Sequence, residues 1–347
     1  MEITFKYILF LIIFYTFILF GHVFLYKSQV KFLKIECATR RVSLSLFYMI
    51  MPTLVFVSFI LINFFDNFVV NALFYISSLW LAVVTYILIA VLINWLVFLF
   101  VKLLDFKLEY KSFHSFLMGL VLFVSIAGIY NYYDIKNEKV EIEIENLPSQ
   151  WEEKKVILIS DVHIGNYRNQ RHLKRLVRKI NEYKPDILFI CGDFFDGTLF
   201  DKDAIIIELS KLRVREKVIF IYGNHELRAN QNDIKSVLTE SKMQILDDEI
   251  IEYQGVIIAG INHSSLKDVE IFEKFSQIIS ATDDRKPFIF LSHEPVRDVE
   301  LLQNTGISLQ LSGHTHNGQF FPFSLITKAI YKEMNYGLHD YGSFKSY

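Results

Sequence analysis

The sequence predicts a protein of two parts, an N-terminal region of four transmembrane helices followed by an α/β domain. The first part contains four uncharged apolar runs, each long enough to match the about 20 residues that cross a bilayer. The second part alternates buried-strand patterns with amphipathic-helix patterns, which is typical of α/β layer folds. The composition agrees, since 52% hydrophobic residues among 347 is high for a soluble protein.

The transmembrane region is expected to cover residues 1–133. Its helices are predicted at about 7–26, 42–65, 72–101 and 113–133. Pro52 and Gly119 lie inside two of them and are tolerated there, because neighbouring helices can satisfy the freed backbone groups. An unusually apolar soluble core is the alternative, but uncharged runs of this length disfavour it. A signal peptide is the alternative for the first run, which lacks a long basic head and a small-residue cleavage site.

Charge divides unevenly between the two parts. Residues 1–130 carry a net charge of +4 and the remainder −6, so nucleic acid is not an expected partner. Basic residues concentrate in the loops at 27–41 and 102–111, whereas the loop around Asp66 has none. The positive-inside rule then places both basic loops in the cytoplasm and the α/β domain on the other side. Cys37 and Cys191 would be separated by the membrane, so no disulfide is expected.

The second part begins with a predicted linker and first strand at residues 134–150, because residues 139–146 alternate apolar and acidic side chains. The α/β domain is expected at 151–347, where strand and helix patterns follow in turn. Strands are predicted at 154–160, 186–191, 217–222, 255–261, 287–292 and 307–312. Helices are predicted at 171–183, 204–212, 231–241, 269–280 and 296–305.

Five of these strands end in side chains that can bind metal ions. The motifs are DVH at 161–163, GDFFD at 192–196, GNHE at 223–226, HEP at 293–295 and GHTH at 313–316. Open α/β sheets bind ligands outside the carboxyl ends of their strands, so these side chains are expected to converge. Each motif alone is weak, because a turn or a cap would explain it. The five together are a specific signal.

The types of side chain indicate which metals would bind. Carboxylate, imidazole and amide groups without thiolate suit Mn, Fe or Zn. The candidate ligands are Asp161, His163, Asp193, Asn224, His293, His314 and His316. Seven ligands with one shared carboxylate fit two divalent ions, which clamp both oxygens of a displacement at phosphorus when about 3.5–4 Å apart. Since residues i and i+2 of an extended segment face the same side, His314 and His316 are expected to reach one ion each.

The ordered motifs resemble those of the calcineurin-like metallophosphoesterases, and most closely the bacterial membrane-anchored branch with YkuE-like and YaeI-like members. The likeness extends over residues 139–347. It implies a β-sandwich flanked by helices, a metal-dependent phosphoric ester hydrolase activity and a phosphorylated substrate. Members of this branch run on for a few dozen residues beyond the equivalent of Tyr347, so the last strands of the sandwich are the ones this chain could lack.

The resemblance also assigns ligands to each ion. Asp161, His163 and His316 would hold the first ion, whereas Asn224, His293 and His314 would hold the second. Asp193 would bridge both.

For the reaction itself, the resemblance implies a hydroxide bridging the two ions as the nucleophile. His225 would protonate the leaving oxygen, and the Asp196 carboxylate would orient His225. This chain has Asn262 and His263 where the family has an Asp pair, and we expect His263 to be an exposed loop histidine. Asn317 stands in place of a family glycine and is expected to adopt the same left-handed backbone.

The sequence therefore predicts a phosphoesterase anchored in a bacterial cytoplasmic membrane, hydrolysing a phosphomonoester, phosphodiester or pyrophosphate bond. A lipid or nucleotide-linked lipid is a fitting substrate, and membrane lipids are expected partners. The basic helix at 168–179 either contacts substrate phosphate or anionic lipid headgroups, or is a solvated face, and the solvated face is favoured. The alternative function is a membrane sensor or transport module with an inactive phosphoesterase-like domain. His22 and His114 are the only Asp, Glu, Lys, Arg or His residues inside the runs, which is few for a transport pathway.

Overall fold

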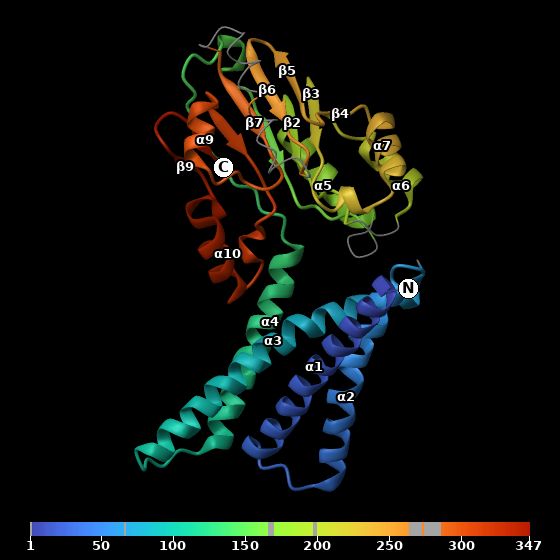
Figure 1. The fold of residues 1–347 in the computed structure, drawn as a ribbon, viewed down its shortest axis with the longest axis vertical. Helices are drawn as coiled ribbons and strands as arrows, with labels where there is room; N and C mark the ends of the chain where they lie inside the picture. Colours follow the sequence, from blue (N-terminus) through green and yellow to red (C-terminus); the bar gives the residue numbers. More distant parts are fainter. Residues whose placement is uncertain (1, 66, 166–169, 197–199, 264–272, 274–285) are drawn as a thin grey trace. The chain divides into compact units, whose positions relative to one another are not determined.

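The computed structural model describes residues 2–65, 67–165, 170–196, 200–263, 273 and 286–347. The chain divides into two compact units, Met1–Asn137 and Glu138–Tyr347. The first unit is helical, and the second contains both sheets and helices (Figure 1).

The first unit consists of four helices that match the four apolar runs. They are α1 (Glu2–Phe32), α2 (Ala38–Leu61), α3 (Phe68–Leu103) and α4 (Tyr110–Tyr133). Among the helices in the described ranges, α2, α3 and α4 are long and apolar enough to cross a membrane. Three of the four predicted spans therefore have support from the structure, and the crossing by α1 stays a prediction.

The two histidines of the first unit are buried and hydrogen-bonded. Trp80 Nε1 on α3 donates to His22 Nε2 on α1 at 3.0 Å. His114 Nε2 on α4 donates to Gln29 Oε1 on α1 at 2.8 Å. Such bonds between apolar helices contribute about 0.6–2 kcal/mol each. Both histidines therefore help to hold α1 against its neighbours.

The first sheet of the second unit is parallel, in the order β1-β2-β3-β4. Its strands are β1 (Val156–Ile159), β2 (Ile187–Cys191), β3 (Lys217–Ile221) and β4 (Gln244–Ile245). The helices α5 (Gln170–Tyr183), α6 (Lys202–Leu209) and α7 (Gln231–Glu240) share a hydrophobic core with this sheet. Leu173, Leu176, Val177 and Ile180 form the buried side of α5, as their spacing predicted.

The second sheet is mixed, in the order β5-β6-β7-β8-β10-β9. Its strands are β5 (Glu249–Tyr253), β6 (Val256–Gly260), β7 (Phe288–Leu291), β8 (Leu309–Leu311), β9 (His339–Asp340) and β10 (Lys345–Ser346). The four inner strands are parallel, and the edge strands β5 and β9 are antiparallel to their neighbours. Two helices accompany this sheet, α9 (Val299–Asn304) and α10 (Phe323–Tyr331).

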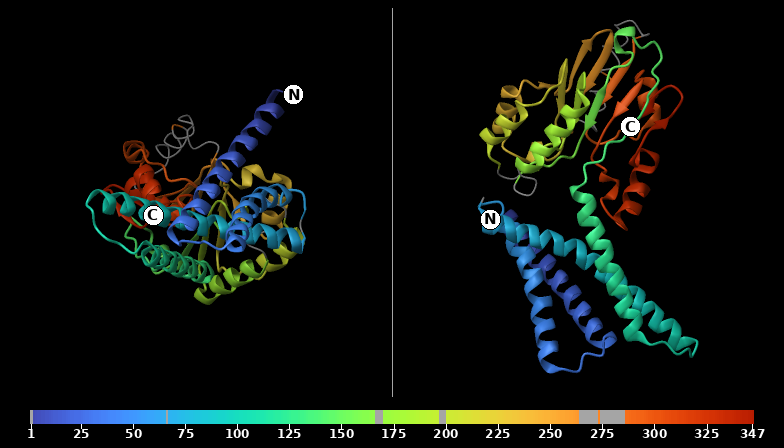
Figure 2. Two further views of the ribbon diagram at one scale, coloured as in Figure 1. Left: turned by 90° about the horizontal axis from the view of Figure 1, so that it is seen from below. Right: turned by 180° about the vertical axis from the view of Figure 1, so that it is seen from behind.

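The two sheets meet through one apolar core. Phe189 of β2, Ile258 of β6 and Leu291 of β7 belong to it, and all three are fully buried. Helices α5 to α7 lie on the outer side of the first sheet and α9 on the outer side of the second (Figures 1 and 2). The α/β arrangement of two layers flanked by helices is therefore the one that the sequence predicted.

The strand predicted at 139–146 does not form, and this prediction was wrong. Ile142, Ile144 and Leu147 pack against the core between the sheets, although residues 139–144 carry no strand pairing. The alternation signalled one buried face of an extended segment, and such a face does not require a neighbouring strand. The edge strand β5 and the helix α10 were not predicted. The helix predicted at 269–280 lies outside the described residues.

Candidate metal centre

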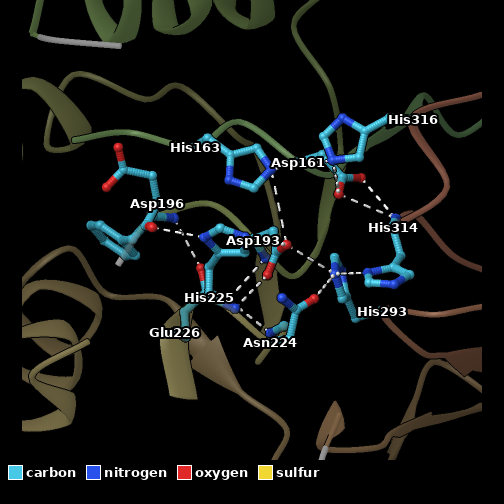
Figure 3. A network of polar contacts seen from close by, with 12 residues as sticks. Asp161, His163, Asp193, Asp196, Asn224, His225, Glu226, His293, His314 and His316 are labelled. Carbon is cyan, nitrogen blue, oxygen red and sulfur yellow. Dashed lines mark hydrogen bonds and ion pairs between the residues drawn. The ribbon is translucent and has the colours of Figure 1, made fainter. Parts of the chain in front are cut away.

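The predicted side chains converge from both sheets, because the strands that carry them are parallel and end at one edge of the sandwich (Figure 3). Asp161 and His163 follow β1, Asp193 follows β2, Asn224 and His225 follow β3, His293 follows β7, and His314 and His316 follow β8. Backbone bonds hold the loops together. Asp161 N donates to Gly192 O at 3.1 Å, and Gly313 N donates to His293 O at 2.8 Å.

Two glycines allow these loops to approach one another closely. A Cβ on Gly223 would lie 2.3 Å from Asp193 Oδ1, and a Cβ on Gly313 would lie 2.5 Å from Asp161 Oδ2. Real side chains do not tolerate such distances, so only glycine fits at either position.

Five of the candidate ligands adopt a left-handed backbone. Their φ angles are 56° for Asp161, 52° for His163, 51° for Asp193, 69° for His314 and 48° for His316. Non-glycine residues rarely occupy this region, at a cost of about 1–3 kcal/mol each, and those that do cluster at functional sites. These five backbone conformations therefore lower the stability of the fold, and they set the directions in which the candidate ligands point.

The expectation that His314 and His316 lie on an extended segment was wrong. The segment is not extended, because both histidines have positive φ while Thr315 between them is right-handed helical, with φ −71°. The two rings nevertheless join different groups, since this sharp turn separates them. Asn317 follows with φ 48°, the left-handed backbone that was expected.

The first group of potential ligands contains Asp161, His163 and His316, whose ligand atoms all lie within 4.8 Å of one another. His316 Nε2 is 3.2 Å from Asp161 Oδ1 and 3.3 Å from His163 Nε2. Burial, together with the neighbouring His225 and His316, lowers the pKa of His163 to about 4, although Asp193 opposes this. His163 is therefore neutral at physiological pH, which is the form of imidazole that binds metal.

The second group contains Asp193, His293 and His314, again within 4.8 Å. His293 Nε2 lies 3.1 Å from Asp193 Oδ2, 3.0 Å from His314 Nδ1 and 3.2 Å from Asn224 Oδ1. Burial and the nearby His293 lower the pKa of His314. Three polar atoms thus surround His293 Nε2, more than its single proton or lone pair can satisfy.

Asp193 belongs to the second group but also faces His163 of the first, and it is almost fully buried. Its Oδ2 is 3.1 Å from His293 Nε2 and 3.9 Å from the Nε2 atoms of both His163 and His225. Burial opposes ionisation of this carboxyl, but His293 and His225 hold its pKa below the ordinary value. One oxygen of Asp193 therefore faces ligands of both groups.

His225 is oriented by Asp196, but not in the way the sequence suggested. Its Nδ1 donates to the main-chain carbonyl oxygen of Asp196 at 2.7 Å. The Asp196 carboxylate points away from His225 instead (Figure 3). It lies beside Gly165, where an added Cβ would be 2.1 Å from Asp196 Oδ1. A carbonyl accepts the imidazole proton as a carboxylate would, so the tautomer is fixed and Nε2 is left facing the centre.

Glu226 is a residue of the centre that sequence reasoning missed. It is fully buried, and its carboxylate accepts hydrogen bonds from the backbone N–H groups of Asp193 at 2.8 Å, Phe195 at 2.9 Å and Gly223 at 2.7 Å. Burial raises its pKa to about 7, although the bonds from these N–H groups act against the rise. Glu226 thereby ties the loop after β2 to the loop after β3.

His263 was expected to be an exposed loop histidine, and that expectation was wrong. It is half-buried, with its ring 5.6 Å from the ring of His314 and 5.7 Å from that of His293. It follows β6, an inner strand of the second sheet. The rule that found the other residues, polar groups at the carboxyl ends of parallel strands, would have found His263 as well.

The sequence profile of the calcineurin-like phosphoesterase family matches residues 154–318, which contain all the residues described above. An uncharacterized metallophosphoesterase of Helicobacter pylori strain J99 is 30% identical over 177 residues, 51% of this chain and 48% of that protein. The metallophosphoesterase YkuE of Bacillus subtilis is 30% identical over 223 residues, 61% of this chain and 77% of YkuE.

A vertebrate relative is named as a membrane protein. The chain is 27% identical over 240 residues to a "transmembrane protein with metallophosphoesterase domain" of Danio rerio, 62% of this chain and 53% of that protein. The alignments span 48% to 61% of the length of the first three curated relatives. Together with α2, α3 and α4, this similarity marks the chain as a membrane protein.

Proposed function

Since the chain belongs to the calcineurin-like phosphoesterase family, we propose that it is a membrane-anchored phosphoesterase that uses two divalent metal ions. The observation that carries the proposal is Asp193, whose carboxylate faces both groups of potential ligands. The assignments are those made from the sequence. Asp161, His163 and His316 hold one ion, Asn224, His293 and His314 hold the other, and Asp193 bridges them.

The donor atoms suit this pair of ions. Imidazole, carboxylate and amide groups lie at mutual distances of 3.0 to 3.3 Å around His293 and His316, where lone pairs would repel unless a proton or cation lies between them. When bound, such ions lower the pKa of a water molecule and neutralise charge on a phosphoryl oxygen. The protein's own contribution is to hold the ligands in place and to keep His163 and His314 unprotonated.

For the anchor, we propose that α1 crosses the membrane together with α2, α3 and α4. The basic loops at 27–41 and 102–111 then lie in the cytoplasm of a bacterium, and the phosphoesterase unit lies outside it. A phosphorylated lipid, or a lipid linked to a nucleotide, is the substrate that this location favours. The bond hydrolysed is a phosphomonoester, phosphodiester or pyrophosphate bond.

Metal dependence tests the proposed activity directly. The full chain in detergent, stripped with a chelator, is expected to hydrolyse neither p-nitrophenyl phosphate nor its bis ester, and to recover on addition of Mn, Fe or Zn. Folding is checked independently in a Cys37→Ser background, because the thiol of Cys191 is fully buried and stays unreactive while the domain is folded. A folded protein that is inactive with every metal on both esters would refute the proposal.

His225 is proposed to protonate the leaving oxygen, since Nδ1 is held by Asp196 O and Nε2 faces the centre. His225→Asn is expected to lower kcat about 100-fold or more on an alkyl phosphate. The loss should be much smaller on p-nitrophenyl phosphate, whose leaving group needs no proton. His339→Asn, near the end of the chain, is the control. Equal losses on both esters would assign His225 a structural role.

A further inference from the structure

The region around α10 exposes an unusual number of apolar side chains. Of the nine exposed large apolar side chains in the described part of the second unit, seven lie within residues 321–338. We call six of them the α10 face: Phe321, Phe323, Leu325, Ile326, Ile330 and Tyr336. Soluble surfaces scatter such residues singly, and a concentration of them marks a contact with a partner or a membrane.

Basic groups accompany this face. Lys328 and Lys332 are exposed at the end of α10. Arg297 is also exposed, with its guanidinium over the ring of Tyr331 at 5.4 Å and bonded to Ile330 O at 3.0 Å. α10 thus exposes Phe, Leu and Ile side chains with basic residues beside them, a combination found in helices that lie in the lipid headgroup layer.

The short connection between α4 and the second unit indicates that the partner of the α10 face is the membrane. Tyr336 Oη donates to the Glu138 carboxylate at 2.7 Å, so the α10 face includes a residue bonded to the first residue of the second unit. Glu138 follows Tyr133, the last residue of α4, by five positions, and five residues span at most about 18 Å. Because α4 is long and apolar enough to cross a membrane, a bilayer that holds α4 is close to Glu138 and Tyr336.

Two residues next to the α10 face, Tyr331 and Asn335, are hydrogen-bonded to the loops of the candidate metal centre. Thr315, between His314 and His316, donates through Oγ1 to Asn335 O at 2.7 Å. Asn335 Nδ2 donates to Asn317 Oδ1 at 2.6 Å. Tyr331 Oη donates to Glu294 at 3.0 Å, next to His293. A contact that restrains the end of α10 therefore also restrains the loops that carry His293, His314 and His316.

We propose that the α10 face docks into the headgroup layer of the membrane that holds α4, so that the metal centre receives phosphate groups of lipids in that membrane. The substrate part of this inference rests on the proposed function, whereas the docking part does not. The apolar side chains enter the acyl boundary, and Lys328, Lys332 and Arg297 meet the lipid phosphates.

Docking is tested on the full chain reconstituted in phosphatidylcholine and phosphatidylglycerol vesicles. In a Cys37→Ser background, Leu325→Cys carries an environment-sensitive fluorophore, and Ile207→Cys on α6 is the control. The two positions match, since Leu325 is 58% exposed and Ile207 56%. We expect blue-shifted emission and quenching by doxyl-labelled lipids at position 325 only. Emission at position 325 that is unquenched and as red as at position 207 would overturn the docking.

The link to the substrate is tested with Leu325→Glu combined with Ile326→Glu, against Ile207→Glu. The double variant is expected to lose about 10-fold or more on phosphatidic acid in vesicles and to keep its activity on p-nitrophenyl phosphate. Equal losses on both substrates, or no loss on either, would overturn the link. Should the unchanged chain hydrolyse neither substrate, nor bis-p-nitrophenyl phosphate, the proposed function fails, and the fluorophore at position 325 still decides whether α10 docks.

Discussion

Asp193→Asn is expected to lower kcat/KM on bis-p-nitrophenyl phosphate by more than about 1,000-fold, which corresponds to about 4 kcal/mol of lost transition-state stabilisation. A two-metal centre supplies stabilisation of this size. One oxygen of this carboxylate approaches ligands of both groups.

The amide cannot replace this carboxylate in either orientation. With its NH₂ at the position of Oδ2, it points donors at the place where the ions are proposed to bind. With its NH₂ at the position of Oδ1, it opposes the backbone N–H of His225, which now donates to Oδ1 at 2.8 Å. The substitution also removes one of only two carboxylates among the seven proposed ligands, so the affinity for cations falls.

Two measurements on the Asp193→Asn variant separate lost metal from lost folding. Metal analysis of the gel-filtered protein is expected to give fewer than two ions per chain, while the Cys191 thiol stays protected. Asp203→Asn, an exposed position in the first turn of α6, should retain both ions and full activity. An Asp193→Asn chain with two ions and near-normal kcat/KM would show that Asp193 is not the bridge.

Much of the candidate site was predictable, because it depends on two properties that sequence patterns report directly. Apolar runs locate the parallel strands, and the residues just after them must lie at one edge of the sheet. That rule alone brings Asp161, Asp193 and His293 together. Applied to β6, it would also have included His263, which was set aside because the position departs from the family pattern.

The remaining features depend on backbone geometry that no periodicity encodes. The left-handed backbones of His314 and His316 replace the extended segment that was expected, yet they separate the two rings as required. Asp196 acts through its carbonyl because its carboxylate turns into the space beside Gly165. The face of α10 was missed for another reason, since apolar residues in a short helix predict burial and not exposure.

Glu226→Ala is expected to unfold the phosphoesterase unit at a markedly lower temperature than any exposed substitution. The substitution leaves three buried N–H groups without an acceptor, those of Asp193, Phe195 and Gly223. Each buried donor left without an acceptor costs about 1–3 kcal/mol, so the loss exceeds about 3 kcal/mol. For a unit of this size, each kcal/mol lowers Tm by about 2–4 °C.

Glu226→Gln separates the hydrogen bonds from the charge. The glutamine oxygen can replace Oε2, which accepts from both Asp193 and Gly223, but its NH₂ then opposes the N–H of Phe195. At the same time, the variant no longer buries a charge, which the raised pKa of Glu226 shows to be unfavourable. Its Tm should therefore lie between those of the unchanged chain and the alanine variant.

Both variants can be followed in the full chain through the reactivity of Cys191, since burial raises the pKa of this thiol and shields it. In a Cys37→Ser background, a thiol-reactive dye reports the opening of the second unit during heating. Glu249→Ala, at an exposed position of β5, should leave the transition unchanged. If Glu226→Ala and Glu249→Ala unfold at the same temperature, the Glu226 carboxylate does not hold the loops after β2 and β3 together. If instead only Glu226→Ala melts early and the glutamine variant keeps its fold but loses activity, Glu226 sets the position of Asp193 as well as the stability of the centre.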